Sequence, residues 1–344
     1  MLYCKRNNEY YLLSSTPFFI RIPALLSLHH LAPIRYFHNS FFLIVILLFL
    51  SKFSVSQHRN DTLSFFSHSS QLNNNRLRGI ILTGSAGYIA TMAGLNELWY
   101  NRFPRSGFHF FNDNNEWLQV DKAGHVMTSY YVGKIGMDAL KWSGLPAKKA
   151  LWCGTLGLAF LSTVELFDGF SDQWGASPGD MAANAMGTAF LIAQESLWDE
   201  QRILLKFSFS PTEYAQHRPY TLGNNFQEQA LKDYNGQTYW LSLNISSFLN
   251  NQTTFPRWLN AAFGYGANGM MGGTVNPITD NNGNPFPVFK RARQYYFSID
   301  IDLTRLKTKP TCLHAFFNTF GFVKFPAPSI EYSGNKIKFH PLFF

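Results

Sequence analysis

The stretch Asp121-Lys122-Ala123-Gly124-His125 begins the part of the chain that decides the expected fold. Two further polar groups follow it: Glu165-Leu166-Phe167-Asp168, and Ser177-Pro178-Gly179-Asp180, which leads into Asn184 and Gly187. The sequence between the groups is apolar and rich in Gly and Ala. Ionisable side chains are costly to bury without a partner, so their repetition in apolar segments indicates a structural or a chemical role.

Within each group the polar residues are three or four positions apart, a spacing that places side chains on one face of a helix. The sets on a common face are Asp121 with His125, Glu165 with Asp168, and Asp180 with Asn184 and Gly187. Lys122 lies on the same helical turn as Asp121. Three antiparallel helices would therefore direct acids, a histidine and an asparagine toward one interior position.

The fold class that we predict is mainly α, a compact bundle of about four helices followed by a smaller β-containing C-terminal region. The helices are expected near 79–96, 121–142, 146–170 and 177–195 or beyond, where apolar runs are bounded by Pro, Gly and Ser. Alternating apolar and polar residues predict half-buried strands at 239–248 and 297–303. The helix near 79–96 fits either a buried bundle helix or a marginal transmembrane helix, because Thr, Ser and Gly dilute its hydrophobicity.

A leader for export is predicted at residues 1–56. Phe41 to Leu50 is an unbroken apolar run, too short for a membrane span and typical of the central region of a signal peptide. Ser54-Val55-Ser56 offers small residues for cleavage before Gln57, and an uncleaved anchor helix is the alternative. After the leader we expect a polar linker at 57–76, a helical domain at 77–210 and a strand-containing region at 211–344.

Composition narrows the class of partner. The chain has 34 Phe, 16 Tyr and 8 Trp but only 15% charged residues, which favours a membrane-adjacent or extensively buried protein. The formal net charge is +8, but the basic residues form no dense patch interleaved with aromatic residues. Nucleic acid is therefore excluded as a partner, and a membrane surface or other envelope proteins are expected instead.

Three interpretations of the polar groups remain open. The candidate site residues are Asp121, Lys122, His125, Glu165, Asp168, Asp180 and Asn184. Their carboxylates and imidazole suit a divalent metal, with His125, Glu165 and Asp168 as candidate ligands, and no other cofactor is predicted. In a catalytic interpretation His125 is a general base and Lys122 stabilises developing negative charge, but no nucleophile motif accompanies them. In a structural interpretation the groups form a buried ion-pair network that aligns the helices.

The same motifs resemble a known family. The motifs are Asp121-Lys122-x-x-His125, Glu165-x-x-Asp168 and Asp180-x-x-x-Asn184-x-x-Gly187, preceded by Leu98-Trp99-Tyr100. Over residues 78–216 they are similar to the YfiM-like predicted periplasmic lipoproteins of unknown function (DUF2279), and more loosely to VanZ-like membrane proteins. The resemblance implies a bacterial envelope protein with a helical domain and no established activity. This chain lacks the cysteine for lipid attachment that the lipoproteins carry after the apolar run.

Two functional hypotheses follow. The first is an exported, membrane-associated envelope protein with a structural or interaction role, located in the periplasm or at the outer membrane. The second is a membrane-associated hydrolase or transferase that acts on a lipid or cell-wall precursor through the Asp/His/Glu cluster. In the second, the aromatic loop from Phe108 to Trp117 would serve as a lid or a membrane contact. A cleft that reaches the cluster would distinguish the two, because a structural network is sealed.

Overall fold

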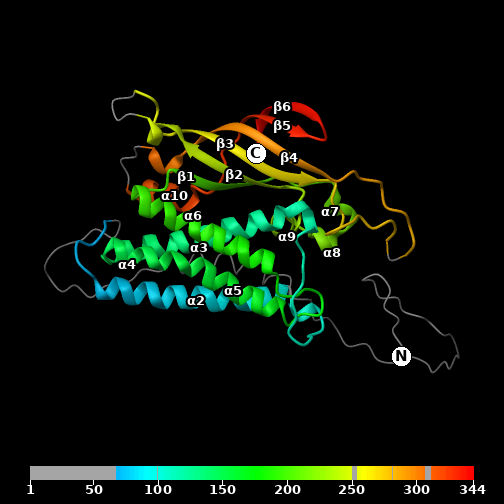
Figure 1. The fold of residues 1–344 in the computed structure, drawn as a ribbon, viewed down its shortest axis with the longest axis horizontal. Helices are drawn as coiled ribbons and strands as arrows, with labels where there is room; N and C mark the ends of the chain where they lie inside the picture. The colour runs from blue at the N-terminus through cyan, green and yellow to red at the C-terminus, as the bar shows by residue number, and fades with distance from the viewer. Residues whose placement is uncertain (1–66, 99, 250–253, 281, 307–310) are drawn as a thin grey trace, which may run out of the picture. The chain divides into compact units, whose positions relative to one another are not determined.

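A layer of helices and a curved sheet make up the described part of the chain (Figure 1). The computed structural model describes residues 67–98, 100–249, 254–280, 282–306 and 311–344. The predicted leader, and the predicted linker up to residue 66, lie outside this part. Residues from Thr62 to Phe344 form one compact unit.

The helical layer contains the segments that apolar periodicity predicts. Its helices are α2 (Asn74–Leu98), α3 (Val120–Trp142), α4 (Ala147–Trp152), α5 (Leu156–Asp168) and α6 (Pro178–Trp198). A 3₁₀ turn joins α4 to α5, so that two helices replace the single one expected near 146–170. α6 begins where its sequence indicates, because the Ser177 hydroxyl accepts a hydrogen bond from the Asp180 backbone N–H and Pro178 occupies the first helical position.

Glycines let α3 lie very close to α5 and α6. A methyl group added at Gly157 of α5 would lie 1.8 Å from the Ser129 carbonyl oxygen of α3. One added at Gly187 of α6 would lie 2.1 Å from the Val126 carbonyl oxygen. The helices therefore meet backbone to backbone at these points. Beside them lies an apolar core of Tyr130, Met137, Ala150, Leu191 and Leu205.

The sheet has six antiparallel strands, each paired with the next along the chain. The strands are β1 (Ile203–Phe209), β2 (Gln237–Asn244), β3 (Leu259–Asn268), β4 (Ala292–Ile301), β5 (Ala327–Ser333) and β6 (Lys336–Phe343). Short helices connect β1 to β2: α7 (Tyr214–His217), α8 (Pro219–Leu222) and α9 (Phe226–Lys232). α10 (Thr311–Phe320) precedes β5.

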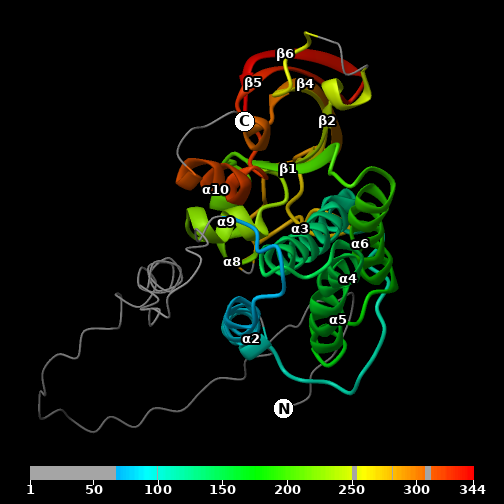
Figure 2. The ribbon, with the colours of Figure 1, turned by 90° about the vertical axis from the view of Figure 1, so that its left-hand side faces the viewer.

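The sheet curls strongly (Figure 2), and many of the side chains buried on its inner side are polar. Lys206 Nζ of β1 lies 2.7 Å from Asp300 Oδ2 of β4, although two strands separate β1 from β4 in the sheet order. Lys324 Nζ lies 3.7 Å from the other oxygen of Asp300, and all three side chains are fully buried. The free edge of β1 is covered, because the Phe207 N–H donates to the Phe322 carbonyl and the Phe207 carbonyl accepts from the Lys324 N–H. These contacts require strong curvature.

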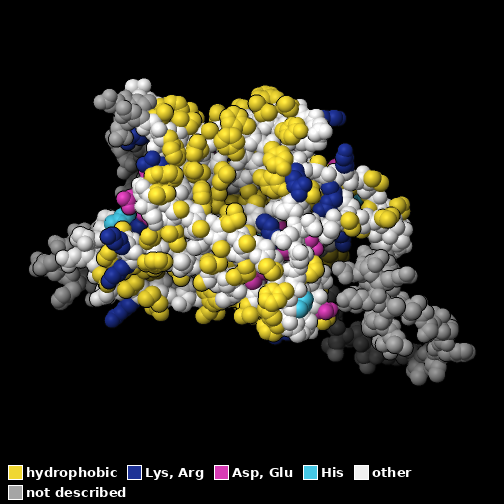
Figure 3. Space-filling model, in the orientation of Figure 1, with side chains coloured by type: hydrophobic (Ala, Val, Ile, Leu, Met, Phe, Trp, Pro, Cys, Tyr) yellow, Lys and Arg dark blue, Asp and Glu magenta, His cyan; other side chains and the backbone are white. Residues whose placement is uncertain are grey.

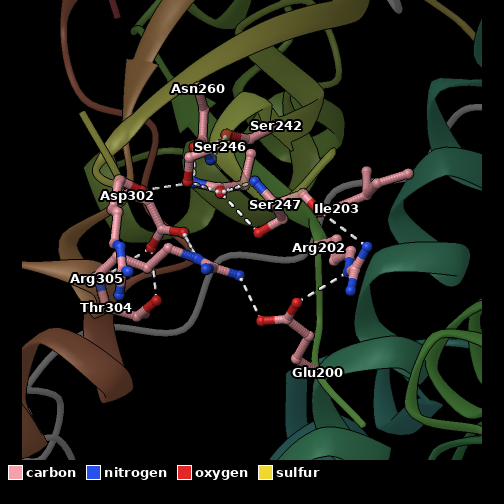
Figure 4. A network of polar contacts seen from close by, with 12 residues as sticks. Glu200, Arg202, Ile203, Ser242, Ser246, Ser247, Asn260, Asp302, Thr304 and Arg305 are labelled. Carbon is pink, nitrogen blue, oxygen red and sulfur yellow. Dashed lines mark hydrogen bonds and ion pairs between the residues drawn. The ribbon is translucent and has the colours of Figure 1, made fainter. Parts of the chain in front are cut away.

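Both apolar and charged contacts join the helices to the sheet. Leu205 of β1 belongs to the core beside α3 and α6. Past the end of α6, Glu200 accepts one bond from Arg202 Nε at 2.8 Å and one from Arg305 Nη2 at 3.1 Å (Figure 4). Because Arg305 follows β4, this carboxylate holds the far end of the sheet next to the last turn of α6.

The predicted fold class, mainly α with a smaller β region, is wrong, because the six-stranded sheet occupies the C-terminal half. β1 alternates weakly, since Leu204 and Leu205 are both buried on opposite faces of the sheet. β3 contains glycines at positions that face the interior. A methyl group added at Gly264 would lie only 2.8 Å from the Trp240 ring. Apolar periodicity therefore failed to identify either strand.

Gly187→Ala should lower the free energy of unfolding by about 1–3 kcal/mol, because the added methyl group overlaps a backbone oxygen. Gly84→Ala in α2 is the matched control, since no described atom lies within 4 Å of its added methyl group. There the better helix propensity of Ala should raise stability by up to about 1 kcal/mol. Chemical denaturation measures both changes. A neutral or stabilising Gly187→Ala would contradict the close approach of α3 and α6.

Candidate functional site

The first turns of α3 and α6 and the last turn of α5 bring the candidate residues to one place. α3 carries Asp121, Lys122 and His125, α5 carries Glu165 and Asp168, and α6 carries Asp180 and Asn184. The helical spacing places the members of each set on one face. We call these residues, together with Asp113 and Tyr100, the polar cluster.

α3 and α6 run in the same direction, since Lys122 pairs with Asp180 near their first turns and Lys141 pairs with Glu195 near their last turns. α5 runs opposite to them. The expectation of three antiparallel helices is therefore wrong for α3 and α6, although the three polar faces still meet.

The Lys122 ammonium lies between three carboxylates. Its Nζ is 2.7 Å from Asp113 Oδ1, 2.7 Å from Asp180 Oδ1 and 3.3 Å from Asp121 Oδ2. Burial lowers the pKa of Lys122, but the charge of Asp121 and the bonds to Asp113 and Asp180 outweigh burial and raise it. Lys122 is therefore a permanent cation that ties the loop before α3 to the start of α6.

The His125 imidazole lies between an amide and three carboxylates. Its Nδ1 is 3.0 Å from Asn184 Oδ1 and 3.8 Å from Glu165 Oε1. On the other side, Nε2 is 3.6 Å from Asp180 Oδ1 and 4.0 Å from Asp121 Oδ1. Burial lowers the pKa of His125, but the surrounding negative charges outweigh it, so that the pKa is raised above its ordinary value.

Ser177 forms hydrogen bonds with two carboxylates of the polar cluster, those of Glu165 and Asp113. Its backbone N–H donates to Glu165 Oε2 at 3.0 Å, and its hydroxyl donates to Asp113 Oδ1 at 2.6 Å. Glu165 Oε1 and Asp180 Oδ1 are buried and accept no hydrogen bond from a described residue, although the Lys122 charge is close to the latter. Burial raises the pKa of Glu165, and burial with the charge of Asp121 raises that of Asp180 to about 7.

Asp168 lies at the edge of the polar cluster, where Tyr100 holds it. The Tyr100 hydroxyl donates to Asp168 Oδ1 at 2.9 Å. Burial and the charge of Glu165 raise the pKa of Asp168 to about 7, against the effect of the Tyr100 hydrogen bond. Asp168 therefore forms a hydrogen bond with Tyr100, and it interacts with the other acids through longer-range electrostatic repulsion.

Sequence reasoning missed three residues of the site. Asp113 comes from a loop and Tyr100 from a short 3₁₀ helix (Tyr100–Arg102), where no periodicity marks a side chain that will point inward. Tyr100 belongs to the Leu98-Trp99-Tyr100 motif, but sequence reasoning did not predict it as a site residue. Tyr234, in the region expected to be separate from the helices, donates its hydroxyl to Asp121 Oδ1 at 2.7 Å. A Cβ on Gly124 would lie 2.9 Å from the Tyr239 hydroxyl, so the sheet contacts the first turns of α3 directly. Local sequence carries no signal for these long-range contacts.

The polar cluster is buried but not sealed. The side chains of Asp121 and His125 are 19% and 18% exposed, whereas that of Glu165 is only 5% exposed. An open groove between α3 and α6 reaches Lys122 and is lined by Asn114, Lys122, Ala123, Val126, Pro178, Gly179, Ala182, Ala183 and Met186. A small molecule can therefore approach one side of the cluster, and both catalytic and structural interpretations stay compatible with its geometry.

The ligand atoms that converge in the polar cluster differ from the set expected from spacing alone. Oxygen and nitrogen atoms of Asp121, His125 and Asp180 all lie within 4.8 Å of one another. Glu165 faces the opposite nitrogen of the imidazole, and Asp168 is engaged by Tyr100. Carboxylate and imidazole donors of this kind can bind a divalent metal, hold a proton or orient a water molecule.

Comparison with known proteins adds one finding. Residues 108–195 match a family model described as predicted periplasmic lipoprotein (DUF2279). The matched segment contains all the residues proposed for the site from sequence, but covers less than half of the chain. The description supports an exported envelope protein of unknown function, and the finer YfiM-like and VanZ-like resemblances stay predictions. Neither curated proteins nor solved structures gave a match.

Asp168→Asn should make the free energy of unfolding less dependent on pH. The pKa of Asp168 is about 7 in the folded chain and 3.8 in its ordinary state, so the folded state holds this proton more tightly. Its contribution to stability is therefore lost as the pH rises from about 4 to 7. The variant keeps an acceptor for Tyr100 and removes this loss, so its stability relative to the unmodified protein should increase over that range. Denaturation at several pH values measures this, and parallel curves would contradict the prediction.

Proposed function

We propose that this chain is a membrane-bound protein of the bacterial cell envelope whose sheet contacts lipid through its outer face. The observation that carries the proposal is an inverted distribution of side chains, with polar groups inside the curled sheet and apolar groups outside. A soluble antiparallel sheet with one solvated face shows the opposite arrangement. The match to predicted periplasmic lipoproteins supports the envelope as the location.

One row of apolar side chains crosses five strands on the outer face. Cross-strand pairing aligns Leu241, Phe263, Phe297, Ile330 and Phe339. Each of them is between 46% and 66% exposed, even though the Phe263 and Phe297 rings contact each other at a tilt of 51°, with centroids 5.3 Å apart. Contiguous apolar surface of this kind is unfavourable in water and typical of a surface that meets another apolar phase.

A row of tyrosines lies beside the apolar row, two residues along each strand. Tyr239, Tyr265, Tyr295 and Tyr332 are aligned by the same pairing, and Ile337 completes the row. Tyr239 and Tyr265 pack against the helical layer, whereas Tyr295 and Tyr332 are 49% and 48% exposed. Beyond it, at the same end of the strands, lie the basic residues Arg293 and Lys336. Tyrosine followed by basic residues is the order found where a protein surface passes from hydrocarbon to lipid head groups.

The length of the apolar surface suits insertion into lipid. On β4 it extends from Ile301 to Tyr295, which corresponds to about 20 Å along the strand. That is more than half of a hydrocarbon core of about 30 Å. Hydrophobic side chains gather over the strands in the upper part of the space-filling view, while Lys and Arg lie mainly toward its left and right (Figure 3). The exposed tyrosines of the row, Tyr295 and Tyr332, would therefore lie at the head groups, with the apolar row in the hydrocarbon.

The interior of the sheet supports the same conclusion. Its side chains satisfy one another, as in the bond from Ser242 to Asp300 Oδ2 at 2.6 Å and from Asn260 to Ser242 at 2.9 Å. The same side also holds a small apolar core of Trp240, Ala262 and Tyr296, which is buried and lies on the opposite face of the sheet from the exposed apolar rows. In the helical layer, the described stretch Ala147–Asp168 is long and apolar enough to cross a membrane, and 28% of its most apolar window is buried. This stretch is weaker support, because core helices pass the same test.

Residue-specific spin labelling tests the proposal, because the apolar leader could by itself bring the chain to a membrane. The three native cysteines are changed to Ser, and a nitroxide is attached at Phe297→Cys in the full chain. In vesicles of phosphatidylethanolamine and phosphatidylglycerol, position 297 should be accessible to oxygen and protected from a water-soluble nickel chelate. The matched control is Ile278→Cys, in a loop off the sheet and 83% exposed, which should show the reverse. Equal access of the nickel chelate to both positions would exclude lipid contact by the sheet.

A second candidate function is a hydrolase or transferase acting on a lipid or cell-wall precursor. The groove that reaches Lys122 favours it, since its walls include the apolar Val126 and Met186. Purified full chain is assayed with p-nitrophenyl phosphate and p-nitrophenyl butyrate, and compared with His125→Ala. Loss of a general base reduces turnover by about 10²- to 10⁴-fold, so turnover that disappears in the variant supports an enzyme. Turnover that is equal in both proteins comes from another source and contradicts it.

A further inference from the structure

We infer that Asp121, His125 and Asp180 form a binding site for one divalent transition-metal ion, with Zn²⁺ as the best match to the donors. The site would lie at the first turns of α3 and α6, beside the groove that reaches Lys122. One imidazole and two carboxylates, with one side open, resemble the three protein ligands and free position of catalytic zinc sites. The inference is independent of lipid binding by the sheet.

The spacing of the donor atoms is the first observation. His125 Nε2 lies 3.6 Å from Asp180 Oδ1 and 4.0 Å from Asp121 Oδ1. Both distances are too long for hydrogen bonds, so the atoms converge without bonding to one another. Around a tetrahedral ion with bonds of about 2.0–2.2 Å, donor atoms lie about 3.3–3.5 Å apart. All three donor atoms lie within 4.8 Å of one another, so shifts of about 1 Å would bring them into that geometry.

The orientation of the imidazole is the second observation. Asn184 is fully buried, and its Oδ1 lies 3.0 Å from His125 Nδ1. If that nitrogen donates to the amide oxygen, the lone pair of Nε2 points toward the two carboxylates. A hydrogen bond to the distal nitrogen is the usual way in which proteins orient a metal-binding histidine. The Tyr234 hydroxyl bonds to Asp121 Oδ1 at 2.7 Å and would orient that ligand in the same manner.

The third observation is a buried carboxylate oxygen whose cationic partner, Lys122, is shared with Asp113. Asp180 is only 5% exposed, and its Oδ1 accepts no hydrogen bond from the residues that the structure describes. Lys122 Nζ is 2.7 Å from this oxygen, but it is equally close to Asp113 Oδ1. Lys122 can therefore keep Asp113 as its partner while an ion takes Asp180. Because carboxylates outnumber cations in the polar cluster, the site favours a cation over an anionic ligand.

Calorimetric titration with ZnCl₂ alone tests the inference. The full chain is purified in mild detergent and dialysed first against a chelator and then against buffer. One ion should bind per chain, and His125→Ala and Asp180→Asn should each weaken binding by at least about 10-fold, since even the partners of metal ligands contribute that much. Asp168→Asn is the matched control within the polar cluster and should bind Zn²⁺ as the unmodified chain does.

Lys122→Met separates a metal site from a purely structural network. Removing the competing ammonium should leave Zn²⁺ binding intact or make it tighter. Absence of saturable binding in both the unmodified chain and Lys122→Met would overturn the inference, and so would unchanged affinity in His125→Ala. Equal affinity for Mg²⁺ and Zn²⁺ would overturn the assignment to a transition metal. If His125→Ala does not fold by circular dichroism, the rise in melting temperature with Zn²⁺ is compared between the unmodified chain and Asp121→Asn, where a similar rise would count against the site.

Discussion

The contact of one ammonium with three carboxylates is the interaction on which the helical layer depends. The carboxylates come from the loop before α3, from α3 and from α6, and all three contact Lys122. Buried carboxylates at such short range repel one another strongly unless a cation lies between them. Lys122 therefore holds the end of the loop against the first turn of α6. The close approach of α3 to α5 and α6 at Gly157 and Gly187 allows the remaining acids to reach the same position.

The need of buried charges for partners of opposite charge also explains how side chains are distributed in the sheet. Lys206 and Lys324 are buried beside Asp300, so the curled sheet must supply polar partners around these charges in its interior. Side chains alternate along a strand, and the apolar residues of β3 to β6 are consequently placed on the outside. The alternation of side chains along each strand therefore has two effects: it buries the charged residues inside the sheet and exposes the apolar residues on its outer face. In the helical layer, buried charge is concentrated at one end of α3 and α6, next to the sheet through Tyr234.

Helical periodicity was sufficient to locate α2, α3 and α6 and to group the polar residues by face. It succeeded because each of these helices has a long apolar stretch, and because Ser177 and Pro178 mark the start of α6 by local chemistry. Apolar alternation located parts of β2 and β4 but missed β1 and β3. In β1 both faces are buried, and in β3 the glycines carry no pattern. Strands of this kind can be identified only from the strands with which they pair, and those strands are distant in sequence.

The sequence by itself determined which residues could form the polar cluster and that they would share helix faces, because the i, i+3 and i+4 spacing is a local property of the chain. Only the tertiary structure decided which ligand atoms meet. Asp121 and Asp180 converge on His125, whereas Glu165 faces the other nitrogen and Asp168 bonds to Tyr100. The physical reason is that the rotation of each helix about its axis is set by packing against its neighbours, and those contacts join residues far apart in the chain.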